Sequence, residues 1–231
     1  MKLFENKSNI PLDVIRYIDT FVYIRLNNET IIHAVKLYFK DREKSVILYG
    51  EMQYWNTSRV SNMSRLFENI TGQIPDISRW NVTNVTDMSR MFWACKNFNQ
   101  NLNNWNTLNV RTMHGMFSHA YDFNGDISTW NVSNVEDMSS IFMNAVSFNT
   151  DISEWNVSNV TDTSFMFYQA DNFNSNISKW NVSNVKFMSY MFRSAEKFNI
   201  DISKWNITGA KDTVTMFIKC DIKEQYKPTV N

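Results

Sequence analysis

The chain has 231 residues, and its 23 basic and 23 acidic side chains give a formal net charge of zero. This balance argues against the broad basic surface that attracts nucleic acid or anionic lipid. The N-terminus lacks the continuous apolar core of a cleaved export signal, and no later stretch approaches the roughly 18 uninterrupted apolar residues of a membrane span. We therefore expect a soluble protein that contacts neither nucleic acid nor the membrane interior.

The first 54 residues precede any repetition. Residues 1–8 are polar and predict a flexible tail, and residues 9–54 predict a helical cap. A helix over residues 10–22 is indicated by Pro11 near its first position and Asp13 in its first turn, although the β-branched run from residue 21 to 24 also fits a strand.

A second helix of the cap has clearer signals. Ile31, Val35 and Tyr38 form a helical stripe with Phe39, and Asn28 or Thr30 supplies a residue that can cap its first turn. Residues 45–49 predict a further helical turn that ends at Gly50. Because the open end of a stack of repeats exposes apolar core, residues 9–54 are expected to cover it.

From residue 55 onward the chain repeats itself without insertion or deletion. Seven tryptophans stand 25 residues apart, which is the signature of stacked supersecondary units: Trp55, Trp80, Trp105, Trp130, Trp155, Trp180 and Trp205. We expect one seven-coil solenoid over residues 55–223, followed by a C-terminal tail over residues 224–231.

Each unit combines two periodicities. Around Trp130, the apolar residues Ile127 and Val132 alternate with polar ones and predict a short strand, so that stacking would build a parallel sheet. From Val135 to Ala145 the apolar spacing of three, three, one and three predicts a short helix. The predicted fold class is α/β, with one strand and one helix in every coil.

The repeated motif, seen at residues 138–160 as MSSIFMNAVSFNTDISEWNVSNV, resembles that of the BspA-like leucine-rich-repeat group. The resemblance covers roughly residues 30–220. It implies a right-handed solenoid of the leucine-rich-repeat type, protein binding or surface adhesion, and no catalytic residues. The group consists of bacterial surface protein repeats of unassigned function and also occurs in protists and large DNA viruses. For a chain without an export signal, this implies a cytosolic or virion-associated location.

No residues form a recognisable catalytic, cofactor or metal site. Cys95 and Cys220 lie five coils apart, which at a ~4.8 Å spacing is roughly 24 Å and too far for a disulfide. The three histidines share neither a repeat phase nor a triad spacing. The asparagines that follow each tryptophan, such as Asn131, are expected to form a ladder of amides along the predicted sheet.

Positions that differ between coils are the best guide to function, because the residues that hold the fold are kept alike. Four aromatic residues lie outside the apolar stripe in neighbouring coils and suggest a protein interface: Phe165, Tyr168, Phe187 and Tyr190. The residues just before the tryptophans suggest a second set of contacts on the predicted sheet face, through Arg79, Glu154, Lys179 and Lys204.

These observations favour a non-enzymatic protein-interaction scaffold that binds a protein partner or associates with itself. An alternative is an adaptor, because residues 10–18 faintly resemble the opening helix of an F-box, with the repeats binding a target. Surface adhesion is the third possibility.

Overall fold

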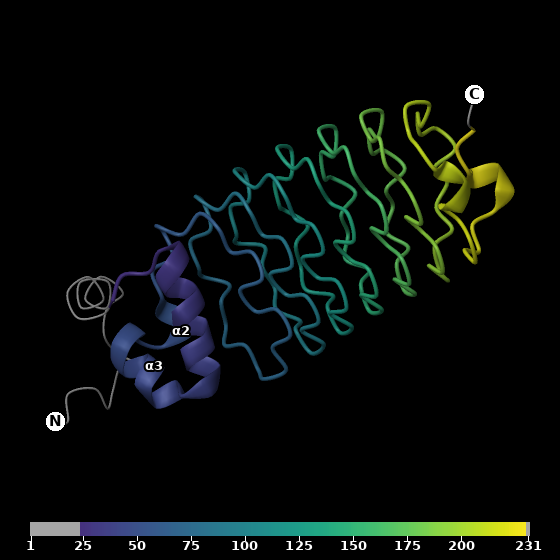
Figure 1. The fold of residues 1–231 in the computed structure, drawn as a ribbon. Helices are drawn as coiled ribbons and strands as arrows, with labels where there is room; N and C mark the ends of the chain where they lie inside the picture. Colours follow the sequence, from purple (N-terminus) through teal and green to yellow (C-terminus); the bar gives the residue numbers. More distant parts are fainter. Residues whose placement is uncertain (1–23, 230–231) are drawn as a thin grey trace.

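The computed structural model describes residues 24–229. Figure 1 shows a row of stacked coils, with helices α2 (Asn28–Lys40) and α3 (Arg42–Tyr49) at the N-terminal end and short helical turns at the C-terminal end. The predicted tail and the whole helix predicted for residues 10–22 lie outside the described residues, and so do the last two residues of the chain.

Helix α2 spans Asn28–Lys40 and contains the predicted apolar stripe, with Ile31, Val35 and Tyr38 buried. Its N-cap is Asn27 instead of Asn28. The side chain of Asn27 accepts hydrogen bonds from the first turn of the helix, and Thr30 bonds back to the Asn27 backbone. Asn28 reaches instead to the first coil, where its side-chain oxygen accepts the backbone N–H of Ser61.

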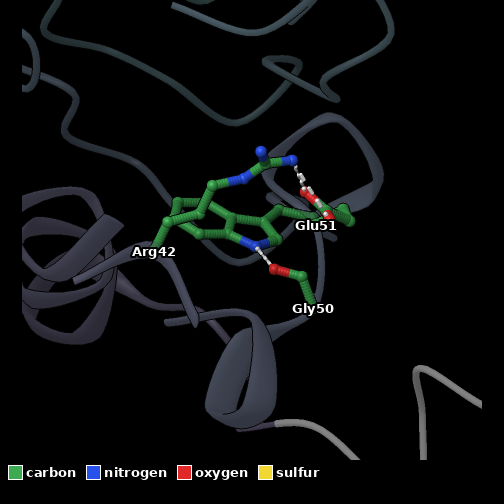
Figure 2. Close-up of polar contacts among 4 residues, drawn as sticks. Arg42, Gly50 and Glu51 are labelled. Carbon is green, nitrogen blue, oxygen red and sulfur yellow. Dashed lines mark hydrogen bonds and ion pairs between the residues drawn. The ribbon is translucent and has the colours of Figure 1, made fainter. Parts of the chain in front are cut away.

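Helix α3 spans Arg42–Tyr49 and is longer than the predicted turn. It ends at Gly50, whose φ of 77° favours glycine. Figure 2 shows the contact that follows this ending: the carbonyl of Gly50 accepts the indole N–H of Trp55 at 2.9 Å, and Arg42 pairs with Glu51 at 3.1 Å. A 3₁₀ turn, η2 (Met52–Tyr54), leads into the coils.

The coils contain no sheet, so the predicted parallel-strand architecture is wrong. Within residues 24–229 the only β-pairing consists of isolated parallel bridges between neighbouring coils, such as that between Asp137 and Asp162. The segment around Trp130 is bent by turns: the Trp130 N–H donates to the Ile127 carbonyl, and the Ser133 N–H donates to the side chain of Asn131. Two successive turns therefore reproduce the alternation of buried and exposed residues that predicted a strand.

The helix predicted for residues 135–145 is also absent. An α-helix would bond the Phe142 N–H to the carbonyl four residues before it, at Met138. In the structure this N–H donates to the Met166 carbonyl in the next coil at 3.0 Å, while the Ile141 N–H closes a four-residue turn onto the Met138 carbonyl. A leucine-rich-repeat solenoid with one strand and one helix per coil is therefore not what this sequence forms.

The outward residues of this segment have left-handed backbone. Counting each repeat tryptophan as position 0, positions 10 and 14 have φ between 54° and 61° in successive coils, as at Ser140 and Asn144. Non-glycine residues adopt this region at a cost of roughly 1 kcal/mol or more. Bonds between coils offset this cost, since the N–H groups of positions 10 and 14 donate to neighbouring carbonyls, as from Ser140 to Ser164 and from Asn144 to Tyr168.

The interior is made of aromatic columns that run along the stack. Trp130 stacks with Trp105 and Trp155, with ring centroids 6.2 and 6.4 Å apart. Beside this column, Phe142 lies 3.7 Å from Phe148 in its own coil and 5.8 Å from Phe167 in the next. Each coil therefore packs on both of its neighbours.

Asparagine ladders also join the coils, but not at the predicted position. The asparagine after each tryptophan caps a local turn, as Asn131 does. Four positions after the tryptophan, by contrast, the side-chain amide of Asn134 donates to the Leu108 carbonyl of the preceding coil. A second ladder links Asn149 to Asn124 through a backbone N–H and a side-chain oxygen.

Helix α2 lies across the N-terminal end of the stack. Tyr38 packs edge-on against Trp55 at 6.2 Å, and Phe39 packs against Phe67 at 6.5 Å. At the other end, η3 (Thr213–Thr215) interrupts the last coil, and η4 (Glu224–Tyr226) follows in the segment predicted to be a tail. There the Tyr226 carbonyl accepts the N–H of Ile202.

Candidate functional site

Three of the four predicted interface aromatics meet on the side of the stack. The Phe165 ring lies 5.0 Å from that of Tyr190 and 5.8 Å from that of Tyr168. The guanidinium of Arg193 lies 5.1 Å from the Tyr190 ring and 5.9 Å from the Tyr168 ring. These four half-buried residues are called the aromatic–arginine cluster below.

The turns of the coil place this cluster on the surface. Phe165 and Tyr190 occupy position 10 of adjacent coils, with φ of 60° and 58°. Their side chains therefore point away from the interior, which is filled by the flanking residues Met166 and Met191. Tyr168 and Arg193 occupy position 13 of the same two coils, so that the bonds between coils bring all four side chains together.

Phe187 is not part of this cluster. It lies at position 7, is 43% exposed, and has the ammonium group of Lys211 5.7 Å from its ring. Among the described residues, no ring contact joins Phe187 to Phe165, Tyr168 or Tyr190. Its backbone instead forms the isolated bridges that link its coil to the coils on either side.

The four predicted charged contacts are all exposed, but they do not lie on a sheet. Arg79, Glu154, Lys179 and Lys204 occupy a turn just before each tryptophan. Within residues 24–229 no ion pair joins any of them to another charged side chain. Lys179 borders a shallow polar groove of about 340 Å³ with Asp151 and Ser175. This column is therefore a set of solvated charges rather than a network.

A second aromatic group on the same side of the stack escaped sequence reasoning. The Arg90 guanidinium lies 4.3 Å from the Trp93 ring, and the His119 ring lies 5.4 Å from Trp93 and 6.2 Å from Tyr121. Arg90 and Trp93 occupy positions 10 and 13, the columns of the aromatic–arginine cluster. The sequence did offer a signal for this group, because positions 10 and 13 hold bulky or charged residues in several coils.

Burial and local hydrogen bonds shift the pKa values of several titratable side chains in the coils. Burial raises the pKa of the Cys95 thiol to about 12, and the thiol donates to the Phe67 carbonyl. Burial, together with the charge of Lys96, lowers the pKa of His119. Hydrogen bonds from Ser78 hold the pKa of Asp76 below its usual value, because this carboxylate caps a turn.

Cys95 and Cys220 are both free thiols, as their separation in the sequence predicted. Within residues 24–229, no three His, Cys, Asp or Glu side chains lie close enough to hold a metal ion. In the same range, no helix has the length and apolar character needed to cross a membrane.

A comparison with known protein families identifies the family to which the repeat belongs. A family model described as "Mycoplasma protein of unknown function, DUF285" matches residues 35–148 and again residues 122–228. The chain belongs to the DUF285 family. DUF285 is the BspA-like repeat family, so the resemblance seen in the sequence is confirmed at the level of the repeat family. Neither the curated proteins nor the solved structures contain a match to this DUF285 chain.

Proposed function

We propose that this DUF285 chain is a non-enzymatic scaffold that binds a protein partner through the aromatic–arginine cluster. The single observation that supports this proposal is the gathering of Phe165, Tyr168, Tyr190 and Arg193 on the outside of a stack whose interior is already filled. Tyrosine, phenylalanine and arginine are enriched in protein interfaces, and tyrosine and arginine dominate their energetic centres.

The repeat explains why this surface is specialised. Interior positions hold the same kind of residue in each coil, as with Met166 and Met191 or with Phe167 and Phe192. Position 10, by contrast, changes from arginine at residue 90 to glycine at 115, serine at 140, phenylalanine at 165 and tyrosine at 190. Because the backbone follows the same course at each of these positions, side chains can change there without disturbing the stack.

The aromatic rings of the aromatic–arginine cluster are restricted by neighbouring side chains but remain partly exposed. Half-buried aromatics already restricted by their neighbours lose little side-chain entropy when a partner covers them. Arg193 lies over two of these rings and, within the described residues, forms no ion pair with an acid. It therefore remains available to a carboxylate of the partner, which favours a protein surface that combines apolar and acidic side chains.

Changing Phe165 and Tyr190 together to serine is the direct test. Both side chains lie outside the interior columns, so we expect the free energy of unfolding to change by no more than about 1 kcal/mol. Loss of buried aromatic anchors should weaken partner binding or self-association by at least ~2 kcal/mol, or roughly thirtyfold. Thermal melting, light scattering and affinity capture from the native source measure these effects.

Leu108→Ser is the matched control, because Leu108 is 42% exposed on a coil remote from the cluster. A partner retained by this control and lost by the double variant supports the proposal. If the double variant binds as the wild type does, the cluster is not the interface. If it instead loses several kcal/mol of stability without losing association, these aromatics belong to the core.

A further inference from the structure

Asn-x-Ser and Asn-x-Thr triplets recur along the coils, and this motif is the acceptor for sugar attachment to an asparagine side chain. One set of triplets starts at position 1, directly after the repeat tryptophan, and we call its members the open triplets. Their asparagines, all exposed, are Asn56, Asn81, Asn131, Asn156, Asn181 and Asn206. A second set starts at position 4, at Asn84 and Asn159, which are also exposed. The two sets therefore share both motif and exposure.

The amide nitrogen that would carry the sugar is free in the open triplets. The Asn131 Oδ1 atom accepts the backbone N–H of Ser133 at 3.1 Å and closes a turn at the surface. Within residues 24–229, the Asn131 Nδ2 atom has no acceptor and the Ser133 hydroxyl has no partner. The same turn forms in each of the other open triplets, where Nδ2 likewise has no acceptor in the described part of the chain.

In the triplets at position 4, the same two polar groups hold neighbouring coils together. The Asn159 Nδ2 atom donates to the Ser133 carbonyl of the preceding coil at 2.7 Å. The hydroxyl of Thr161, which completes this triplet, donates to the Glu136 carbonyl at 3.1 Å. The triplet of Asn84 is held in the same way, with distances of 2.8 and 3.2 Å. A sugar could be added at position 4 only after both of these bonds were broken.

The backbone also presents the open triplets outward. Their middle residue is part of the interior, as Val132 is at 1% exposure, so the asparagine and the hydroxyl on either side of it face the solvent. The hydrogen bond to Oδ1 favours loss of a proton from Nδ2, because it stabilises the negative charge that the carboxamide oxygen then gains. In the third coil Asn106 forms this turn at 3.2 Å, but Leu108 stands where the hydroxyl residue is needed.

We infer that the open triplets are N-glycosylation sites, at which a soluble glycosyltransferase moves a sugar from a nucleotide sugar to the folded chain. The asparagine Nδ2 atom forms a bond to the sugar C1 atom while the bond from C1 to the diphosphate oxygen breaks. The nucleoside diphosphate leaves with that electron pair, and a basic side chain of the enzyme takes the Nδ2 proton. Position 1 lies in a different turn of the coil from positions 10 and 13, so this inference does not rest on the function proposed above.

Mass spectrometry of the chain isolated from its native source shows which asparagines carry a sugar. We expect a hexose or N-acetylhexosamine on one or more of the open triplets. Occupancy at Asn84 and Asn159 should be at least about tenfold lower, because their bonds between coils open only rarely in the folded state. Asn106, which has the turn without the hydroxyl, should carry none.

Two variants at equivalent positions separate the triplet from its surroundings. The folded full chain is incubated with UDP-glucose and a soluble N-glycosyltransferase, and the modified asparagines are mapped. Ser133→Ala removes the hydroxyl but keeps the backbone N–H that Asn131 accepts, so glucose should be lost at Asn131 alone and thermal melting should not change. Leu108→Ser supplies the missing hydroxyl, so Asn106 should gain glucose. In a protease digest, where the bonds between coils are absent, Asn159 should accept glucose as readily as Asn131.

Three results would overturn the inference. The first is the absence of sugar from all open triplets in the chain from the native source, whatever the purified enzyme does. The second is equal occupancy at positions 1 and 4 in that chain, which would mean that sugar was added before the coils formed, as in transfer from a lipid-linked donor to a nascent chain. The third is glucose retained at Asn131 in Ser133→Ala, or not gained at Asn106 in Leu108→Ser.

Discussion

Replacing Trp130 with alanine is expected to lower the free energy of unfolding by about 3–5 kcal/mol. The side chain is 3% exposed and stacks on two neighbouring tryptophans, and its indole N–H donates to the Leu102 carbonyl at 2.9 Å. Its removal leaves a cavity shared by three coils, and the Leu102 carbonyl keeps only the Trp105 backbone N–H as a donor. Because each coil is stable only on its neighbours, the loss should spread along the stack. Chemical denaturation followed by tryptophan fluorescence and circular dichroism measures it.

Trp93→Ala is the matched control for this experiment. Trp93 is the tryptophan outside the repeat column and is half-buried on the side of the stack under Arg90. We expect its replacement to cost about 1 kcal/mol. If the melting temperature of Trp130→Ala stays within about 2 °C of the wild type, Trp130 does not support the core.

Gly125→Ala is expected to cost about 2–3 kcal/mol, for a different reason. A Cβ atom at residue 125 would lie 2.0 Å from the backbone oxygen of Gln100 in the preceding coil, which is not compatible with any normal contact. Gln100 cannot easily move away, because its side chain is tied to the backbone of Ile74, Pro75 and Ile77. The strain should therefore be taken up by shifting one coil against the other.

Gly209→Ala provides the comparison. There the nearest atom to an added Cβ is the Ser183 oxygen at 3.9 Å, which is an ordinary contact. Since alanine restricts the unfolded chain more than glycine does, this change should be neutral or stabilising by up to about 1 kcal/mol. Equal effects at the two sites in urea denaturation would show that the close approach at Gly125 is not real.

The sequence was sufficient to predict which residues are buried. Trp130, Met138, Phe142 and Ala145 all lie in the interior, and the stripe of α2 is buried against the first coil. These predictions depend only on apolar side chains recurring with a fixed period. A period shows which residues share an environment, but several backbone paths can place the same residues inside.

The local backbone could not be predicted because contacts between coils determine it. Apolar spacings of three and one suit an α-helix, and they also suit successive turns in which every fourth outward residue is left-handed. Phe165, Tyr190 and Arg90 occupy such positions, although glycine and asparagine are the residues that usually signal them. The hydrogen bonds that impose this conformation join residues 24 positions apart, as from the Phe165 N–H to the Ser189 carbonyl, and no local propensity reveals them.

Only part of the aromatic–arginine cluster could be predicted from the sequence, because the backbone turns that bring its side chains together depend on contacts between coils. Phe165, Tyr168 and Tyr190 could be grouped because they are aromatic, lie outside the apolar stripe and recur in neighbouring coils. Phe187 was included with them because a helix would have turned it toward the same side. Arg193 was overlooked because its place over the two tyrosine rings depends on the turns rather than on a helical face.

The central structural claim is that the coils are joined by backbone hydrogen bonds between successive turns, without a helix in each coil. Scalar couplings across hydrogen bonds, measured by NMR on the labelled and deuterated chain, identify the carbonyl that each N–H contacts. We expect a coupling from the Phe142 nitrogen to the carbonyl carbon of Met166, 24 residues further along the chain. A coupling from Phe142 to the carbonyl of Met138 would show a helix at this place and contradict the account.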